Sequence, residues 1–427
     1  MITRILIKTL QVFFVRGFGA AVGFLLTLAV TNLTSSHESG LFFLCIALVF
    51  VGARFVLIGS PQAIVRVVGA NSEENWRVIN LQISVILNIV FFLCLCTIII
   101  FTVFSSAIAD LMFQKAALAV LLPTTAIGVL FFALVQIFSS ALQGKHNTVL
   151  ASTVQNVIMP LCFMFGVAVT LLFVGSISAK DLLRLYVAGL SISAFMGFYI
   201  WMQDHRSALT IQTSFPKELR ASLYPLFIVT CMQLCVQWSG QFATAHYLEV
   251  NEIAFFAAAQ RTALLAGFVL VAVNLIVEPR FANAFGKGLT HKVNKLSLLS
   301  SRLMICLAAP VLALMLLFPQ HLMLLFGEEY VVAVPLLQIM AVGQFINVLT
   351  GSVASLLIMT SHEKDFRNVV LISGPLAIIL AIVLTNEFGL IGAAYATAIS
   401  SASQSLFCVY MVKKRLGFNP INVFRRV

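Results

Sequence analysis

Charged side chains are scarce in this sequence: they make up 10% of 427 residues, whereas hydrophobic residues make up 61%. In ordinary soluble domains about a quarter of the residues are charged. Since a soluble fold cannot bury so much apolar surface, this scarcity excludes a soluble globular protein. A helix needs about 20 apolar residues to cross a bilayer, so a chain of this length with short loops predicts about twelve membrane spans.

Acidic residues are the rarer of the charged groups, with 15 Asp and Glu against 26 Lys and Arg. None of them falls in the middle of an apolar run; the closest is Glu278, which follows the eighth run. This argues against a carrier that binds cations or protons on intramembrane carboxylates. The basic residues lie in short loops between apolar runs, so the net charge of +11 indicates membrane topology and not a nucleic-acid partner.

Cysteine and histidine patterns that would hold a metal or a cofactor are also lacking. The eight cysteines all lie inside apolar runs without a CxxC pair, and most of the seven histidines lie in expected loops. We therefore predict no disulfide framework, no metal site and no cofactor. The first apolar run lacks a small-residue cleavage site, so we expect it to be a retained helix.

Twelve apolar runs are long enough to cross a membrane as helices. They fall at residues 10–32, 40–60, 78–103, 116–140, 149–174, 183–202, 221–247, 253–277, 298–318, 331–358, 369–386 and 390–412. With the N-terminus placed in the cytoplasm, 20 of the 26 Lys and Arg residues fall in cytoplasmic loops, three fall outside and three lie within spans. This distribution predicts an all-α polytopic membrane protein with about twelve transmembrane helices and both termini in the cytoplasm.

The two halves of the chain look duplicated. Glu38 precedes the second run and Glu252 precedes the eighth, 214 residues later, and each is followed by a Phe-Phe pair. Pro160 in the fifth run and Pro375 in the eleventh are 215 residues apart, and Leu follows both. These spacings predict a parallel repeat of two six-helix lobes. We place an N-terminal lobe at residues 1–205, a cytoplasmic linker at 206–220 and a C-terminal lobe at 221–427.

Three arginines lie inside expected spans: Arg16 in the first, Arg54 in the second and Arg261 in the eighth. A charge near the centre of a span costs at least about 2.5–3.5 kcal/mol and is a functional hypothesis by default. From the run boundaries, Arg16 and Arg54 lie at one depth, roughly 10 Å from the cytoplasmic end, and Arg261 lies farther out. Because the planar guanidinium grips phosphate oxygens through two hydrogen bonds, the set predicts binding of an anionic substrate. Snorkelling to lipid headgroups and pairing with a buried carbonyl are the alternatives.

The seventh run carries polar side chains at steps of three and four residues, which places them on one helix face. They are Thr230, Gln233, Gln237, Gln241 and Thr244. Because amides both donate and accept hydrogen bonds, we predict that Thr230, Gln233, Gln237 and Gln241 bind sugar hydroxyls in a cavity between the lobes. Hydrogen bonding between helices is the alternative.

Three further groups of residues are compatible with either a cavity wall or helix packing. Shifted back by 214 residues, the polar face of the seventh run falls on a face of mostly small residues in the first run: Arg16, Gly19, Gly23, Thr27 and Val30. The tenth run has a weaker polar stripe of Gln344, Asn347, Gly351 and Ser355, and the fifth run contains Gln155 and Asn156. For the tenth and fifth runs we favour hydrogen bonds to neighbouring helices.

Four stretches of sequence point to one family of transporters. They are Asn251–Arg261 (NEIAFFAAAQR), Glu278–Phe281 (EPRF), Leu325–Tyr330 (LFGEEY) and Phe388–Thr397 (FGLIGAAYAT). On these stretches, and along nearly its whole length, the chain resembles the polysaccharide-unit flippases of the multidrug/oligosaccharidyl-lipid/polysaccharide exporter superfamily. The resemblance implies a twelve-helix, two-lobed transporter that works by alternating access.

The resemblance also implies a cargo and a location. The cargo is an undecaprenyl-pyrophosphate-linked oligosaccharide, such as an O-antigen or capsule repeat unit, which is moved from the cytoplasmic to the periplasmic leaflet of a bacterial inner membrane during lipopolysaccharide or similar biosynthesis. Related lipid II flippases place arginines on their first, second and eighth helices, where Arg16, Arg54 and Arg261 fall here. The chain lacks the two additional C-terminal helices of that type, which favours an O-antigen-like cargo. Membrane lipids and other polysaccharide assembly proteins are the further implied partners.

Two other functions remain open. A drug or organic-cation exporter of the same superfamily would need acidic residues in its cavity, and no run carries one at its centre. A membrane-embedded glycan polymerase or ligase would need a long outer loop with catalytic groups, but the longest outer loop offers only His321, Glu328 and Glu329. We therefore predict a transporter and not an enzyme.

Overall fold

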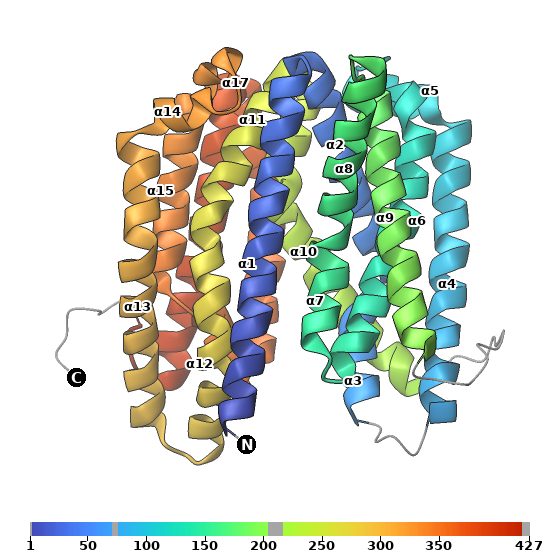
Figure 1. Cartoon of the computed structure of the whole chain (residues 1–427). Helices are drawn as coiled ribbons and strands as arrows, with labels where there is room; N and C mark the ends of the chain where they lie inside the picture. The colour runs from blue at the N-terminus through green and yellow to red at the C-terminus, as the bar shows by residue number, and fades with distance from the viewer. Residues whose placement is uncertain (1, 71–75, 204–216, 421–427) are drawn as a thin grey trace. The chain divides into compact units, whose positions relative to one another are not determined.

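The computed structural model describes residues 2–70, 76–203 and 217–420. Within these ranges the chain consists of helices joined by short turns, without a strand (Figure 1). Contacts divide the chain into two compact units, Met1–Cys231 (unit 1) and Met232–Val427 (unit 2). The boundary lies inside one helix, α10 (Lys217–Tyr247). Most of the predicted linker, residues 206–220, lies outside the described residues.

The number of spans follows from the lengths of the helices. Ten stretches of the described chain are helical, long and apolar enough to cross a membrane. The last of them, α17 (Glu363–Leu416), is 54 residues long and consists of two helices that meet at Gly389, where φ is 58° and ψ is −138°. The helix α10, 31 residues long, carries the polar stripe of the predicted seventh span. If the two parts of α17 are counted separately and α10 is added, the ten stretches become twelve long helices in the described part of the chain, as the sequence predicts.

Unit 1 is organised around α6 (Leu118–Gly144), which packs against α2, α3, α4, α7 and α9. In its core Phe42 stacks on Phe163 with 5.7 Å between ring centroids, and the edge of Tyr186 meets Phe42 at 6.0 Å. Aromatic pairs in these geometries stabilise helix contacts beyond the area that they bury. The other elements of unit 1 are α1 (Ile2–Leu33), α2 (Ser36–Leu57), α3 (Ser60–Ala70), α4 (Trp76–Val103), α5 (Ser105–Ala107), η2 (Ile108–Phe113), α7 (Thr148–Asn156), α8 (Ile158–Val174), α9 (Ala179–Gln203) and the first part of α10.

Unit 2 is organised in the same way around α15 (Val334–Thr350), which packs against α11, α13 and α17. As the tenth span, α15 occupies the position in unit 2 that α6, the fourth span, occupies in unit 1. The edge of Phe255 meets the ring of Tyr330 at 5.2 Å in its core. The other elements of unit 2 are the second part of α10, α11 (Val250–Leu264), η3 (Leu265–Gly267), α12 (Phe268–Gly286), α13 (Thr290–Leu317), α14 (Pro319–Leu324), η4 (Glu328–Ala333), α16 (Val353–Met359) and α17.

The predicted repeat is visible at the start of the second span of each unit. The N-cap of α2 is Ser35, whose hydroxyl accepts a hydrogen bond from the backbone N–H of Glu38. The N-cap of α11 is Glu249, which forms a capping box with Glu252. The two caps are 214 residues apart, as are Glu38 and Glu252. An N-cap satisfies backbone N–H groups that the helix itself cannot bond, so in both units a side chain caps the start of the second span.

Several spans are broken helices, which the uninterrupted apolar runs did not predict. At the end of the second run, α2 changes to α3 at Ile58 and Gly59, whose φ angles are 48° and 75°. A residue in this left-handed region ends a right-handed helix. The eighth span is interrupted by the 3₁₀ turn η3, and the tenth by Gly351, where φ is 72° and ψ is −146°. Each break lies near polar or charged residues of the candidate site.

The helix of the eighth span continues past residue 277, where its apolar run ends. The helix α12 continues to Gly286. This places Glu278 inside the helix, eight residues and about 12 Å from its last residue. Pro279, the next residue, does not end the helix.

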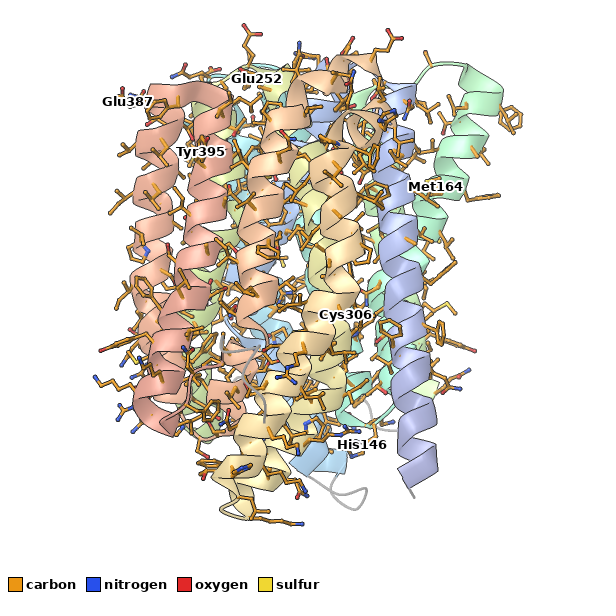
Figure 2. The ribbon with its side chains drawn as sticks, turned by 90° about the vertical axis from the view of Figure 1, so that its left-hand side faces the viewer. His146, Met164, Glu252, Cys306, Glu387 and Tyr395 are labelled. Carbon is orange, nitrogen blue, oxygen red and sulfur yellow. The ribbon has the colours of Figure 1, made fainter. Side chains whose placement is uncertain are left out.

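The surface of the helices is apolar along most of their length. Phe173, Leu172 and Leu111 are 84%, 83% and 78% exposed. Nitrogen and oxygen atoms gather toward the ends of the helices, whereas carbon dominates between them (Figure 2). Glu252 and Glu387 lie at the same end of unit 2 in this view. Such a surface requires lipid around it, so the chain is a multi-pass membrane protein.

An ion pair joins the first and last turns of α17, outside the predicted spans. Arg415 donates to both carboxylate oxygens of Asp365, from Nε and from the terminal Nη2, each at 2.8 Å. The hydrogen bond from Arg415 lowers the pKa of the Asp365 carboxyl below its ordinary value, and the same pair raises the pKa of Arg415. The two parts of α17 are therefore tied together at their free ends.

Candidate functional site

Arg16 and Arg54 lie at one level of two consecutive helices. Arg16 is 17 residues before Leu33, the last residue of α1, and Arg54 is 18 residues after Ser36, the first residue of α2. At 1.5 Å per residue, each lies about 26 Å along its helix from the turn that joins the two. Measured from that turn the two arginines are at a similar level, but Arg54 lies in the last turn of α2, only three residues before Leu57. However, α1 begins at Ile2, so Arg16 lies about 21 Å from the start of its helix and not about 10 Å.

The two guanidinium groups differ in what they contact. Arg16 is half-buried, and its Nε lies 3.5 Å from Ser152 Oγ on α7, a distance at the upper limit for a hydrogen bond. Arg54 is also half-buried, and no residue in the described part of the chain accepts a hydrogen bond from it or pairs with its charge. A guanidinium has five N–H donors. Arg54 is therefore free to bind an anion from outside the protein.

The face of α1 that follows Arg16 is used mostly for packing. A Cβ atom on Gly19 would come within 2.7 Å of the backbone oxygen of Asn156, so α1 and α7 touch there. Thr27 and Val30 are buried, each with 1% exposure. Only Gly23 has open space, with no atom within 4 Å of an added Cβ. The small residues of this face serve helix packing more than they line a cavity.

Gln155 and Asn156 in the fifth span bond to their own unit. Gln155 Nε2 donates to Gln136 Oε1 on α6 at 3.1 Å, and Ser139 Oγ donates to Gln155 Oε1 at 3.4 Å. Asn156 Nδ2 donates to the backbone oxygen of Ser152, at 3.1 Å. The bonds of Gln155 support the interpretation that polar residues of this span join neighbouring helices, whereas Asn156 bonds within its own helix.

Arg261 lies in the last turn of α11, directly before the 3₁₀ turn η3. It is 11 residues from Val250, the first residue of the helix, or about 16 Å along the axis. Its side chain is half-buried. The residue before it, Gln260, lines a cavity of unit 2, whereas Arg261 is not among the residues that line this cavity.

Unit 2 contains a cavity of about 590 Å³ between α10, α11, α12, α15 and α17. This volume lies in the range of about 300–1,000 Å³ that is usual for small-molecule sites. Its polar wall consists of amide and hydroxyl side chains only: Gln233, Gln237, Gln260, Gln344, Asn347, Thr397, Ser401 and Gln404. The remaining wall is apolar and includes Phe268. The arrangement can bind a neutral ligand that carries many hydroxyl groups.

The structure divides the predicted polar stripe of the seventh span. Gln233 and Gln237 are exposed and line the cavity. Gln241 and Thr244 are buried, at 2% and 0% exposure, and do not line it. Thr230 falls in unit 1, and its hydroxyl donates to the backbone oxygen of Leu226 at 2.8 Å. Two of the predicted side chains are thus brought together at one cavity.

The tenth span contributes more cavity-lining residues than we expected. The twelfth span also lines the cavity, although we did not consider it as a cavity wall from the sequence. Gln344 and Asn347 line the large cavity, where Asn347 Nδ2 donates to Gln344 Oε1 at 3.4 Å. Thr397, Ser401 and Gln404 on α17, which packs against α15, also line it. Their spacing of four and three residues is the same helical signal that identified the seventh span. The polar spacing was harder to recognise in the twelfth span because two of its three residues carry only small hydroxyl groups.

A smaller cavity of about 160 Å³ lies beside the first, with Asn347, Ser401 and Gln404 in both walls. Ser355 lines it and donates a hydrogen bond of 2.6 Å to Glu278 Oε1 on α12. Asn274, one turn before Glu278, also lines it, and its buried Oδ1 has no hydrogen-bond partner among the described residues. The acidic group that the sequence placed outside the eighth span is thus bonded within unit 2.

Comparisons with known sequences identify the family. The profile of the polysaccharide biosynthesis protein family matches residues 5–285, about two thirds of the chain. The MatE profile matches residues 225–383. No curated protein matches the chain.

Solved structures share the fold at low sequence identity. The lipid II flippase MurJ in an inward-closed conformation superposes with a TM-score of 0.77 at 18% identity, over 96% of this chain and 87% of that one. An inward-facing MATE-family multidrug transporter gives 0.74 at 14% identity, over 95% and 98%. A MOP-superfamily transporter from Pyrococcus furiosus, described as having a binding pocket of reverse polarity, gives 0.67 at 14% identity, over 96% and 95%. The chain therefore belongs to the polysaccharide biosynthesis protein family, and it has the fold of the lipid II flippase MurJ and of the MATE-family transporters.

Proposed function

We propose that this protein flips an undecaprenyl-pyrophosphate-linked oligosaccharide, such as an O-antigen repeat unit, across a bacterial inner membrane. The cargo moves from the cytoplasmic to the periplasmic leaflet by alternating access of the two units. Both termini lie in the cytoplasm in this proposal, as the distribution of Lys and Arg indicates. The family match supports a role in polysaccharide assembly, and the lipid II flippase with the same fold carries a lipid-linked molecule.

The observation that carries the proposal is Arg54, a half-buried cation inside a span with no acceptor in the described part of the chain. An unpaired charge inside a span costs free energy, so the presence of Arg54 favours a ligand that neutralises it. Arg16 lies at the same level on the preceding helix. Two guanidinium groups match the oxygens of a pyrophosphate, each through paired hydrogen bonds. In this mechanism Arg16 and Arg54 bind the pyrophosphate while the lipid tail stays in the bilayer.

The sugar part of the cargo has different requirements, because its hydroxyls need donors and acceptors without net charge. Gln233 and Gln237 supply amides at the cavity of unit 2, and we assign Thr230 and Gln241 to the same polar helix face. Arg261 lies on the eighth span, near the outer half of the membrane in the proposed orientation. We assign to it a contact with the pyrophosphate late in the cycle, before release.

The membrane potential gives this cycle a direction. A potential that is negative inside contributes about 2.3 kcal/mol for each charge that crosses 100 mV. It drives an anionic cargo outward and favours the inward return of the empty cationic site. An imposed potential is therefore expected to accelerate flipping.

A drug or organic-cation exporter is the second candidate, favoured by the MatE match over residues 225–383. A cationic drug would require a carboxylate beside it. The large cavity has no acidic residue among those that line it, and Glu278 is bonded to Ser355 next to the smaller one. The two candidates thus predict opposite preferences for the charge of the cargo.

The proposal is tested with purified protein in liposomes that carry a fluorescent undecaprenyl-pyrophosphate-linked disaccharide. Exposure of the lipid-linked sugar on the opposite leaflet is measured with a membrane-impermeant enzyme, with and without a potential negative on the cytoplasmic side. We expect flipping that the potential accelerates and that a cationic dye does not inhibit. Absence of flipping together with transport of the dye would contradict the proposal and favour the exporter.

A further inference from the structure

The cavity of unit 2 is polar but carries no charge. All of its lining residues lie in described helices, and none of them is Asp, Glu, Lys, Arg or His. This distinguishes it from the surroundings of Arg16 and Arg54 in unit 1, where the polar chemistry is cationic. The cavity therefore selects for a ligand that forms many hydrogen bonds and has no net charge.

Three of the amides in the wall are available to a ligand. No described residue bonds to the side-chain amides of Gln233, Gln237 or Gln404. Other polar groups in the wall are held by the protein: Asn347 accepts a hydrogen bond of 3.0 Å from Ser405, and Gln260 Nε2 donates to the backbone oxygen of Gln237 at 3.1 Å. The wall thus combines a fixed frame with free donors and acceptors, as a site for a sugar ring requires.

The apolar part of the wall also suits a sugar. Phe268 is 39% exposed and lines the cavity beside Gly267. The nearest atom to a Cβ on Gly267 would be Gln344 Oε1 at 3.9 Å, so the glycine leaves the space next to the ring open. The C–H face of a pyranose packs on an aromatic ring while its hydroxyls bond to amides at the edge.

We propose that this cavity binds uncharged sugar rings of the cargo and discriminates against a glycan that carries a uronic-acid carboxylate at the same position. The inference rests on the proposed flipping of a lipid-linked glycan. A carboxylate in the cavity would lose water without gaining a cationic partner, and an unpaired buried charge is strongly unfavourable. Hydroxyls of a neutral hexose instead find the amides of Gln233, Gln237 and Gln404.

The test uses two undecaprenyl-pyrophosphate-linked disaccharides that differ only at C6 of the second hexose, CH₂OH in one and carboxylate in the other. Both are offered to the full-length protein in liposomes, and initial flipping rates are compared. We expect the neutral cargo to flip at least about tenfold faster, equivalent to about 1.4 kcal/mol. Equal rates for the two cargoes would overturn this inference and leave the proposed function standing. Failure of both cargoes to flip would instead count against the proposed function.

Variants that introduce a charge into the cavity provide a second test, which does not rely on the wild-type comparison of the two cargoes alone. Gln237→Arg and Gln404→Arg each place a cation in the wall, so the uronate cargo is expected to gain at least about tenfold relative to the neutral one. The matched control is Gln338→Arg, on α15 but outside the cavity wall, which should leave the ratio unchanged. An equal shift in all three variants would show that the ratio follows overall charge, and it would overturn the proposal.

Discussion

Replacement of Arg54 by alanine is expected to abolish high-affinity use of the cargo without destabilising the protein. No described residue accepts a hydrogen bond from this side chain, so the fold loses no bond when it is removed. The half-buried charge is itself a cost to the empty protein. We therefore expect the melting temperature of Arg54→Ala in detergent to equal or exceed that of the wild type.

The loss of affinity can be estimated from the bonds that Arg54 is free to make. A hydrogen bond to a charged group contributes about 1.5–3 kcal/mol. At about 1.4 kcal/mol for each tenfold, loss of one such bond raises the cargo concentration for half-maximal flipping roughly 10- to 150-fold. Arg54→Lys keeps the charge but loses the planar fork, so its effect should lie between wild type and Arg54→Ala.

The assay is the initial rate of flipping in liposomes as a function of cargo concentration. Arg184→Ala is the control, because it removes the same charge from a side chain that is 60% exposed and pairs only at 3.7 Å with Asp181. It should flip like the wild type. Unchanged concentration dependence in Arg54→Ala, with normal protein levels, would refute the assignment of Arg54 to the pyrophosphate.

Further predictions concern packing and the ion pair of α17. Gly19→Ala should lower the melting temperature because the new Cβ would come within 2.7 Å of a backbone oxygen of α7, whereas Gly23→Ala has open space and should not. Gly343→Ala would place a Cβ 2.8 Å from a Cα of α17, and we expect a loss of about 1–3 kcal/mol in chemical denaturation, a wild-type midpoint being the contrary result. The pKa of Asp365 is lowered by Arg415, so the pair stabilises the protein above the ordinary value of 3.8 and its contribution is lost as the pH falls below that value. Asp365→Asn should therefore melt below the wild type at a constant offset from pH 7 to 5, and the offset should shrink below about pH 4; an offset that persists there would contradict this linkage.

The helical, membrane-spanning architecture could be predicted because apolar side chains must face lipid. Apolar length fixes where spans occur, and the spacing of Glu38 and Glu252 reveals the duplication that the helix caps then display. The interruptions at Gly59 and Gly351 could not be predicted in this way, because hydropathy gives no information on the sign of the backbone angle φ. The continuation of α12 beyond residue 277, which brings Glu278 into the helix, was missed because hydropathy marks the end of an apolar run and not the end of a helix.

The candidate site was predictable where large polar groups interrupt an apolar face. Gln233 and Gln237 stand out because a glutamine facing lipid is unfavourable, and both line the cavity. Ser401 and Thr397 could not be distinguished from helix-packing residues, since a hydroxyl can bond to its own helix, as Thr397 does to Ala393. Gln241 shows the converse, since it belongs to the polar stripe but is buried.

The proposed mechanism depends on binding of the cargo's pyrophosphate by guanidinium groups of unit 1. It is tested most directly by measuring the affinity of the purified protein for undecaprenyl pyrophosphate and for undecaprenol, which lacks the phosphates, by native mass spectrometry. We expect the wild type to prefer the pyrophosphate at least about tenfold, and Arg16→Ala/Arg54→Ala to bind both lipids equally weakly. An undiminished preference for the pyrophosphate in the double variant would contradict this mechanism.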